Sequence, residues 1–156
     1  MRRREREVGD SERISLILNE CRTCRLALSD ENAPYIVPLS FGYELKGGRL
    51  TLYFHCAKEG RKTDLIKKCC RAGFETDRFR RLVAAEKACG YTAEYSSVIG
   101  WGNVDIVDDN SEKLNGLLAI MRHYTGRSDF DIPDTALSAV CVLKLTAKEF
   151  TCKENA

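Results

Sequence analysis

The chain has 156 residues, of which 44% are hydrophobic and 31% are charged, and its formal net charge is +2. This length suits a single core, so we expect residues 1–156 to form one domain. The near-zero net charge argues against nucleic acid as the main partner. No apolar run could cross a bilayer and no signal peptide precedes the first apolar segment, so we expect a cytoplasmic protein with no membrane partner.

The N-terminal part predicts one helix followed by antiparallel strands. Asp10 or Ser11 can cap a helix whose apolar residues recur at helical spacing over 14–21. Three strands are expected next, at 25–29, 35–43 and 49–54. A glycine turn at 46–48 makes a hairpin of the last two strands. Pro38 cannot donate to a ladder, so its strand should be interrupted, bulged or at a sheet edge.

The C-terminal part predicts more strands around one clear helix. The strands are expected at 73–77, 80–83, 95–107 and 139–145. Gly100 and Gly102 flank Trp101, which indicates a bulge, a barrel corner or close backbone approach, such as a dimer interface needs. The helix begins near Asp109 and ends before Gly126. Hairpin-linked strands argue against a doubly wound parallel sheet, so we expect a mainly β fold with peripheral helices, a closed or split antiparallel β-barrel.

Three cations lie between the strand at 49–54 and a short helix expected at 63–70. They are Lys58, Arg61 and Lys62. A helix N-terminus already carries partial positive charge and unpaired N–H groups, so these cations are misplaced unless an anion binds there. A phosphate is the commonest such anion. The alternative is a basic turn that is simply solvated.

Eight cysteines occur in the chain: Cys21, Cys24, Cys56, Cys69, Cys70, Cys89, Cys141 and Cys152. In a reducing cytoplasm they should be free thiols. Cys21 and Cys24 form a lone C-x-x-C pair between a helix and a strand, which leaves a metal site, a redox pair and two buried apolar thiols open. We expect buried thiols and no bound metal, because no second ligand pair follows at a suitable spacing.

One basic stretch alternates aromatic residues with arginines: Phe74, Arg78, Phe79, Arg80 and Arg81. Such interleaving occurs in modules that bind single-stranded RNA or a phosphorylated partner. The alternative is a strand with a solvated basic face, which the balanced net charge favours.

Three segments of the chain resemble one known superfamily. They are 34–39, 54–62 and 96–102, and the second is the most specific. The chain resembles the FMN-binding split-barrel superfamily of pyridoxamine 5′-phosphate oxidase, and within it the nitroimidazole-resistance branch. The resemblance covers nearly the whole chain. It implies an antiparallel split barrel and a homodimer that holds one FMN in each of two clefts between the barrels.

The resemblance also implies where the cofactor would lie. The strand around Val37, Pro38, Leu39 and Ser40 would face the isoalloxazine through its backbone. His55 and Cys56 would lie beside the flavin, while Lys58, Arg61 and Lys62 would meet its phosphate. The partner subunit would supply Ser97, Val98 and Ile99 to the cleft.

The function that this resemblance implies is an FMN-dependent oxidoreductase, with a nitroreductase-type activity on a small-molecule substrate. His55 is the candidate catalytic residue, because an imidazole titrates near neutral pH and can move a proton during reduction. A histidine that only supports the cofactor is the alternative for this residue. The alternative for the whole protein is a flavin carrier or sensor without turnover.

Overall fold

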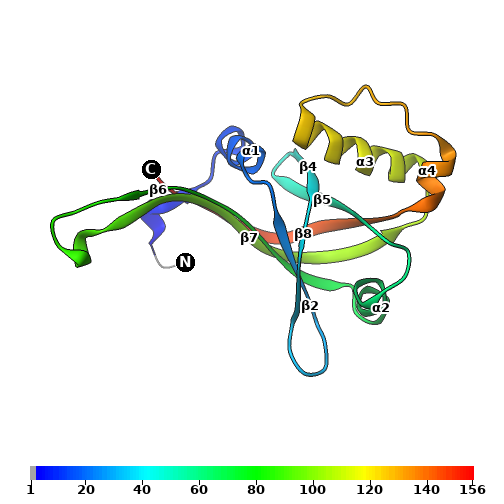
Figure 1. Cartoon of the computed structure of the whole chain (residues 1–156), viewed down its shortest axis with the longest axis horizontal. Coiled ribbons are helices and arrows are strands. Elements are labelled where there is room, and N and C mark those ends of the chain that lie inside the picture. The colour runs from blue at the N-terminus through cyan, green and yellow to red at the C-terminus, as the bar shows by residue number, and fades with distance from the viewer. Residues whose placement is uncertain (1–2) are drawn as a thin grey trace.

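The computed structural model describes residues 3–156 and shows a curved antiparallel sheet with helices on its outside (Figure 1). The sheet has eight strands: β1 Glu7–Val8, β2 Cys24–Leu28, β3 Tyr35–Leu39, β4 Phe41–Lys46, β5 Arg49–Cys56, β6 Arg71–Val83, β7 Thr92–Val107 and β8 Cys141–Asn155. The α-helices are α1 Ser11–Glu20, α2 Arg61–Lys68, α3 Asn110–Thr125 and α4 Asp134–Ala139. Short 3₁₀ turns occupy Arg4–Arg6 and Ala88–Gly90.

The strand order makes the sheet curl back on itself. The order is β3-β2-β6-β7-β8-β5-β4, and β1 pairs with β8 outside this path. The two edge strands β3 and β4 are separated in sequence only by Ser40. Since one residue spans under 4 Å, the end of β3 must lie beside the start of β4, although the two strands do not pair. This arrangement is an antiparallel split barrel with peripheral helices, as the sequence predicted.

The core lies inside the curved sheet and is sealed by α1. Fully buried side chains come from most of the strands, among them Leu26, Phe41, Leu52, Phe54 and Leu143. Ile17 and Leu18 of α1 are also fully buried, which confirms the predicted apolar stripe. The helix begins where expected, because the Asp10 side chain accepts a hydrogen bond from the Arg13 N–H at 2.8 Å.

The helix α3 packs against the outer side of β4 and β5 and builds a second, smaller core. Its residues Ala119 and Ile120 are buried there against Tyr53 of β5. Gly42 permits this contact, because a Cβ at that position would collide with the backbone of Ala119 and Ile120. The strand β4 and the helix α3 are therefore in backbone contact at Gly42.

Several predicted elements differ from the structure in extent. The strand expected at 35–43 breaks at Ser40 into β3 and β4, and Pro38 lies in an edge strand as expected. The segments expected at 73–77 and 80–83 are one strand, β6, with an irregularity in register between Phe79 and Arg81. The last strand is longer than predicted, and α4 was not predicted at all.

The glycines beside Trp101 serve the barrel itself. The pairing of β7 with β8 shifts register between Trp101 and Gly102. A Cβ at Gly102 would collide with the backbone of Thr146 and Ala147, and one at Gly100 would meet Glu149 and Phe150. The close approach that the sequence indicated is therefore made to β8 of the same chain.

Candidate functional site

The predicted phosphate loop forms a small cavity between β5 and α2. The strand ends at Cys56, and α2 begins at Arg61 after Gly60, whose φ of 135° strongly favours glycine. The cavity measures about 190 Å³, and its walls include Tyr35, Cys56 and Lys62. This volume is small, and it suits a compact group such as phosphate better than a whole cofactor.

The first residues of α2, Arg61 to Thr63, line this cavity. No side chain caps the helix at Gly60. The Thr63 hydroxyl donates to the Gly60 carbonyl at 2.7 Å, and the Thr63 side chain is buried, so the turn is held in place from inside. Uncapped N–H groups and the helix dipole both favour an anion at such a terminus.

Arg61 is held beside the cavity by two neighbours from the β2–β3 turn. Its guanidinium forms an ion pair with Asp30, with the Nε–Oδ2 bond at 3.1 Å. Its Cζ lies 4.8 Å from the centre of the Tyr35 ring. Hydrogen bonds from Arg61 are the largest cause of a lowered pKa at Asp30. The arginine is therefore fixed between α2 and this turn, and Asp30 already neutralises part of its charge.

Lys62 is the better-placed unpaired cation. It lines the cavity and is half-buried, and within residues 3–156 it makes no ion pair. Its positive charge acts to lower the pKa of the Cys56 thiol nearby. Lys58 lies on the same loop but is exposed and does not line the cavity. The structure thus brings Cys56, Arg61 and Lys62 together and leaves Lys58 at the rim.

The side of the sheet that points away from the core carries exposed apolar side chains next to β3. We call this side the outer face. Ile36 of β3 and Ile99 and Trp101 of β7 are exposed by 60%, 51% and 42%. The register places them in neighbouring rows, because Ala27 and Gly73 link Ile36 to Trp101 across β2 and β6. Exposed apolar side chains gathered on one face are a feature of binding surfaces, and here they lie beside the Arg25–Glu75 ion pair in the row of Ile99.

A shallow cavity of about 500 Å³ opens on this outer face. Its walls include Ala27, Gly73 and Trp101, and the Arg71 guanidinium lies 5.4 Å from the centre of the Trp101 ring. β3 borders the outer face and is an edge strand. An edge strand leaves backbone N–H and C=O groups unpaired on one side, so a polar ring could bond to them.

The other predicted site residues divide between the two sides of the sheet. Three of them lie on the outer face of the sheet: Pro38, Ser97 and Ile99. Ser40 is exposed at the break between β3 and β4. Val37, Leu39 and Val98 point to the core, so only their backbone atoms could meet a ligand on the outer face. His55 is exposed on β5, and strand alternation directs it to the face opposite Cys56.

Sequence reasoning missed several residues that the structure adds to the site. They are Asp30, Tyr35, Thr63, Trp101 and Cys141. Asp30 and Tyr35 flank a turn far from Arg61 in the chain, and nothing in the sequence states that the turn folds back onto α2. Cys141 pairs directly with Cys56 across β5 and β8, which only the register reveals.

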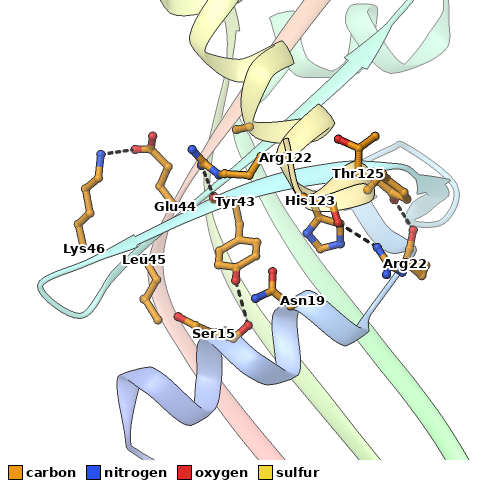
Figure 2. Close-up of a pocket in the computed structure, with 13 residues that line it drawn as sticks. Ser15, Asn19, Arg22, Tyr43, Glu44, Leu45, Lys46, Arg122, His123 and Thr125 are labelled. Atoms are coloured by element: carbon orange, nitrogen blue, oxygen red, sulfur yellow. Dashed lines mark hydrogen bonds and ion pairs between the residues drawn. The ribbon is translucent and has the colours of Figure 1, made fainter. Parts of the chain in front are cut away.

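A larger cavity of about 810 Å³ lies elsewhere, between α1, β4 and α3 (Figure 2). Two of its cations are already paired: Arg22 donates to the His123 carbonyl of α3 at 2.9 Å, and Lys46 pairs with Glu44 on the same strand at 3.0 Å. None of the predicted site residues lines it. Its floor is His123, which is buried and whose Nε2–H donates to the Cys21 carbonyl at 2.7 Å. This cavity therefore lies where α1, β4 and α3 meet, and the paired groups on its wall connect these elements.

The basic stretch on β6 is neutralised by carboxylates. Arg78 and Arg80 both reach Glu20, at 3.0 and 2.9 Å. Arg81 pairs with Glu94 across the hairpin, its Nε at 2.8 Å from Oε2. Paired arginines have little charge left for a phosphate backbone, so this segment favours the solvated strand over an RNA-binding module.

The C-x-x-C pair lies in the core. Cys21 follows α1 and Cys24 begins β2, and both are fully buried. Burial raises the pKa of Cys21 to about 11 and that of Cys24 to about 12. Within residues 3–156, no group of three or more His, Cys, Asp or Glu side chains is arranged to hold a metal ion.

The fold defines a class, the antiparallel split barrel, here with a small cavity at a strand–helix turn. The chain belongs to the pyridoxamine 5′-phosphate oxidase family, a family of flavin-binding split barrels, whose model matches residues 10–154. No curated protein sequence matches it. Within residues 3–156, no helix combines the length and apolar character needed to cross a bilayer.

Solved structures resemble the chain over nearly its full length. A candidate 5-nitroimidazole antibiotic resistance protein from Bacteroides thetaiotaomicron is 31% identical, with a TM-score of 0.80, and the match covers 95% of this chain and 86% of that one. An FAD and heme binding protein from Mycobacterium smegmatis is 18% identical, with a TM-score of 0.80 and coverage of 96% and 73%. The flavocytochrome Anf3 from Azotobacter vinelandii is also 18% identical, with a TM-score of 0.79 and coverage of 100% and 72%. The last two likenesses concern the fold alone.

Proposed function

We propose that this chain binds FMN through the cavity at the β5–α2 turn. The observation that carries the proposal is the unpaired, half-buried Lys62 beside the uncapped N-terminus of α2. A phosphate there gains charge-assisted hydrogen bonds from Lys62 and Arg61 and interacts favourably with the helix dipole. FMN carries a terminal phosphate monoester, which a cavity of about 190 Å³ suits. Lys58 contributes charge from the rim.

The isoalloxazine ring would lie along β3. The backbone of residues 37–40 then supplies hydrogen bonds to the polar edge of the ring, as an unpaired sheet edge can. Ile36 and Ile99 offer apolar surface on the outer face. A single barrel of this size covers only one side of such a ring, so we propose that a second copy of the chain covers the other and forms a homodimer. Ser97, Val98 and Ile99 of that copy would complete the cleft.

When bound, FMN would supply the redox chemistry of an oxidoreductase. The chain would fix its phosphate, orient its ring and shield it from water. His55 is exposed at the end of β5, one residue from the cavity wall. We propose that its imidazole donates a proton to the substrate, from the face of β5 opposite Cys56.

The proposed substrates are small nitro compounds. The support is the likeness to the Bacteroides thetaiotaomicron protein, which covers 95% of this chain at 31% identity. The abundance of cysteines, all of them free thiols in the described structure, suits the reducing cytoplasm as the location.

The test is the reoxidation of reduced FMN on the protein. Purified protein is loaded with FMN, reduced by light without oxygen and mixed with a 5-nitroimidazole in a stopped-flow spectrometer. Reoxidation faster than that of free reduced FMN at the same concentration supports the proposed activity. Tight FMN binding with no acceleration would instead identify a carrier or sensor.

His55→Ala tests the proton donor in the same assay. We expect unchanged FMN content and melting temperature, and a reoxidation rate lowered about tenfold or more, which is the modest end for loss of an acid–base group. His55→Gln is the control for hydrogen bonding without titration. If His55→Ala reacts as fast as the wild type between about pH 6 and pH 8, His55 has no role in proton transfer.

A further inference from the structure

Two cysteines lie opposite each other on the paired strands β5 and β8. Cys56 is the last residue of β5, Cys141 is the first residue of β8, and the register pairs them directly. Directly opposite residues of an antiparallel pair have Cα atoms about 4.5–5.5 Å apart and side chains on one face. A disulfide needs Cα atoms about 4.4–6.8 Å apart. The backbone therefore already meets the distance requirement for a Cys56–Cys141 bond.

The two thiols differ in access. Cys56 is half-buried and forms part of the wall of the cavity at the β5–α2 turn. Cys141 is only 5% exposed and lies in the core behind it. A disulfide whose S–S end reaches into this small cavity meets Cys56 first, and a sulfur adduct on Cys56 then lies beside Cys141.

We propose that Cys56 and Cys141 are a reversible dithiol–disulfide pair that exchanges with small disulfides of the glutathione class. The Cys56 thiolate attacks one sulfur of the small disulfide, breaks its S–S bond and releases one thiolate, which takes up a proton. Cys141 then gives up its proton and attacks the Cys56 sulfur, which releases the second small thiol. The protein dithiol loses two electrons and two protons, and the small disulfide becomes two thiols.

The surroundings of Cys56 set the pH at which this exchange is fast. Burial and, to a lesser extent, the neighbouring Cys141 thiol raise the pKa of Cys56 to about 11, against the opposing positive charge of Lys62. The thiolate is the attacking species, so its fraction increases about tenfold per pH unit below the pKa. Exchange should therefore be slow at neutral pH and should accelerate steadily toward pH 9. The exchange itself requires no flavin, although Cys56 lines the cavity that we propose for the FMN phosphate.

Peptide mapping tests the pair without any substitution. The purified protein is incubated with oxidised glutathione at about pH 9, its remaining thiols are alkylated, and it is digested with trypsin. Cleavage after Arg49, Lys58, Arg127 and Lys144 yields peptides 50–58 and 128–144, each of which holds a single cysteine. We expect these two peptides to be joined, and a dithiol reductant to separate them.

Variants then separate the two steps. Cys141→Ala should accumulate a glutathione adduct on Cys56 that is not resolved, whereas Cys56→Ser should leave Cys141 unmodified. Cys70→Ser and Cys89→Ser are controls on exposed thiols and should leave the joined peptides unchanged. Stable glutathione adducts on Cys56 of the wild-type protein, or a bond from Cys56 to another cysteine, would overturn the proposal. So would the absence of joined peptides when other thiols have reacted.

Discussion

At the scale of residues, the site depends on two neighbours at the start of α2. Arg61 and Lys62 were identified from the sequence alone, because cations at a helix N-terminus are unfavourable without an anion. The structure adds the geometry of these two residues: Lys62 lines the cavity, and Arg61 is held by Asp30 and Tyr35. The position of Arg61 could not be predicted, because it depends on a turn about 30 residues earlier in the chain that lies against α2.

We expect the double variant Arg61→Glu/Lys62→Glu to fold but to lose FMN. Each charge-assisted contact to phosphate contributes on the order of 1.5–3 kcal/mol, and the new carboxylates would repel the anion. The measurement is the FMN content of the purified protein together with its melting temperature. The matched control is Lys67→Glu/Lys68→Glu, at the other end of α2. Equal FMN content in both variants would show that the phosphate does not bind at this turn.

His123 gives the fold a dependence on pH. Burial lowers its pKa, so the neutral imidazole is favoured in the folded chain. The unfolded chain binds a proton near its ordinary pKa of about 6.5, so the free energy of unfolding should be fully retained above that pH and should fall as the pH decreases below it. His123→Gln removes the titration and keeps a donor for the Cys21 carbonyl. Urea unfolding at about pH 7 and about pH 5.5 should show a larger loss for the wild type than for the variant; equal losses would contradict this.

At the scale of elements, sequence patterns predicted the strands and helices better than their limits. Pro38 correctly indicated an edge strand, and Asp109 and Gly126 correctly bounded α3. The two segments expected in β6 proved to be one strand. The sequence did not show this continuity, because the distal half of β6 is exposed and carries no alternation of apolar and polar residues. The close contact of α3 with β4 was also invisible, since no local pattern states what packs on Gly42.

Gly42→Ala tests that contact. A methyl group there would collide with the backbone of Ala119 and Ile120, so α3 must shift outward. We expect a loss of about 1–3 kcal/mol in the free energy of unfolding, as overpacking usually causes. Gly9→Ala is the control, because a Cβ there meets no atom within 4 Å. Similar urea midpoints for the two variants would show that the helix does not press on Gly42.

At the scale of the whole molecule, the proposed dimer rests on surfaces that the single chain leaves open. Ile36, Ile99 and Trp101 expose apolar area beside the edge strand β3. The β6–β7 hairpin extends away from the body of the barrel and exposes Phe79 and Leu82 by 61% and 60% (Figure 1). Both surfaces suit contact with a second copy of the chain.

Ile99→Arg should prevent this association. The arginine would lie across from Glu75, but association would have to remove its charge from water, at a cost that one neighbouring carboxylate offsets only in part. Light scattering at low micromolar concentration should report a monomer with weakened FMN binding. Leu16→Arg is the matched control, because Leu16 on α1 is 53% exposed and lies away from the outer face. A monomeric control variant, or a dimeric Ile99→Arg protein, would place the interface elsewhere.

The central claim is that FMN binds in a cleft between two copies of the chain. Native mass spectrometry of the purified protein supplied with FMN tests it most directly, because one spectrum reports both subunit number and bound cofactor. We predict a single main species with two chains and two FMN molecules. A monomer that retains FMN, or a dimer that binds none, would contradict the account.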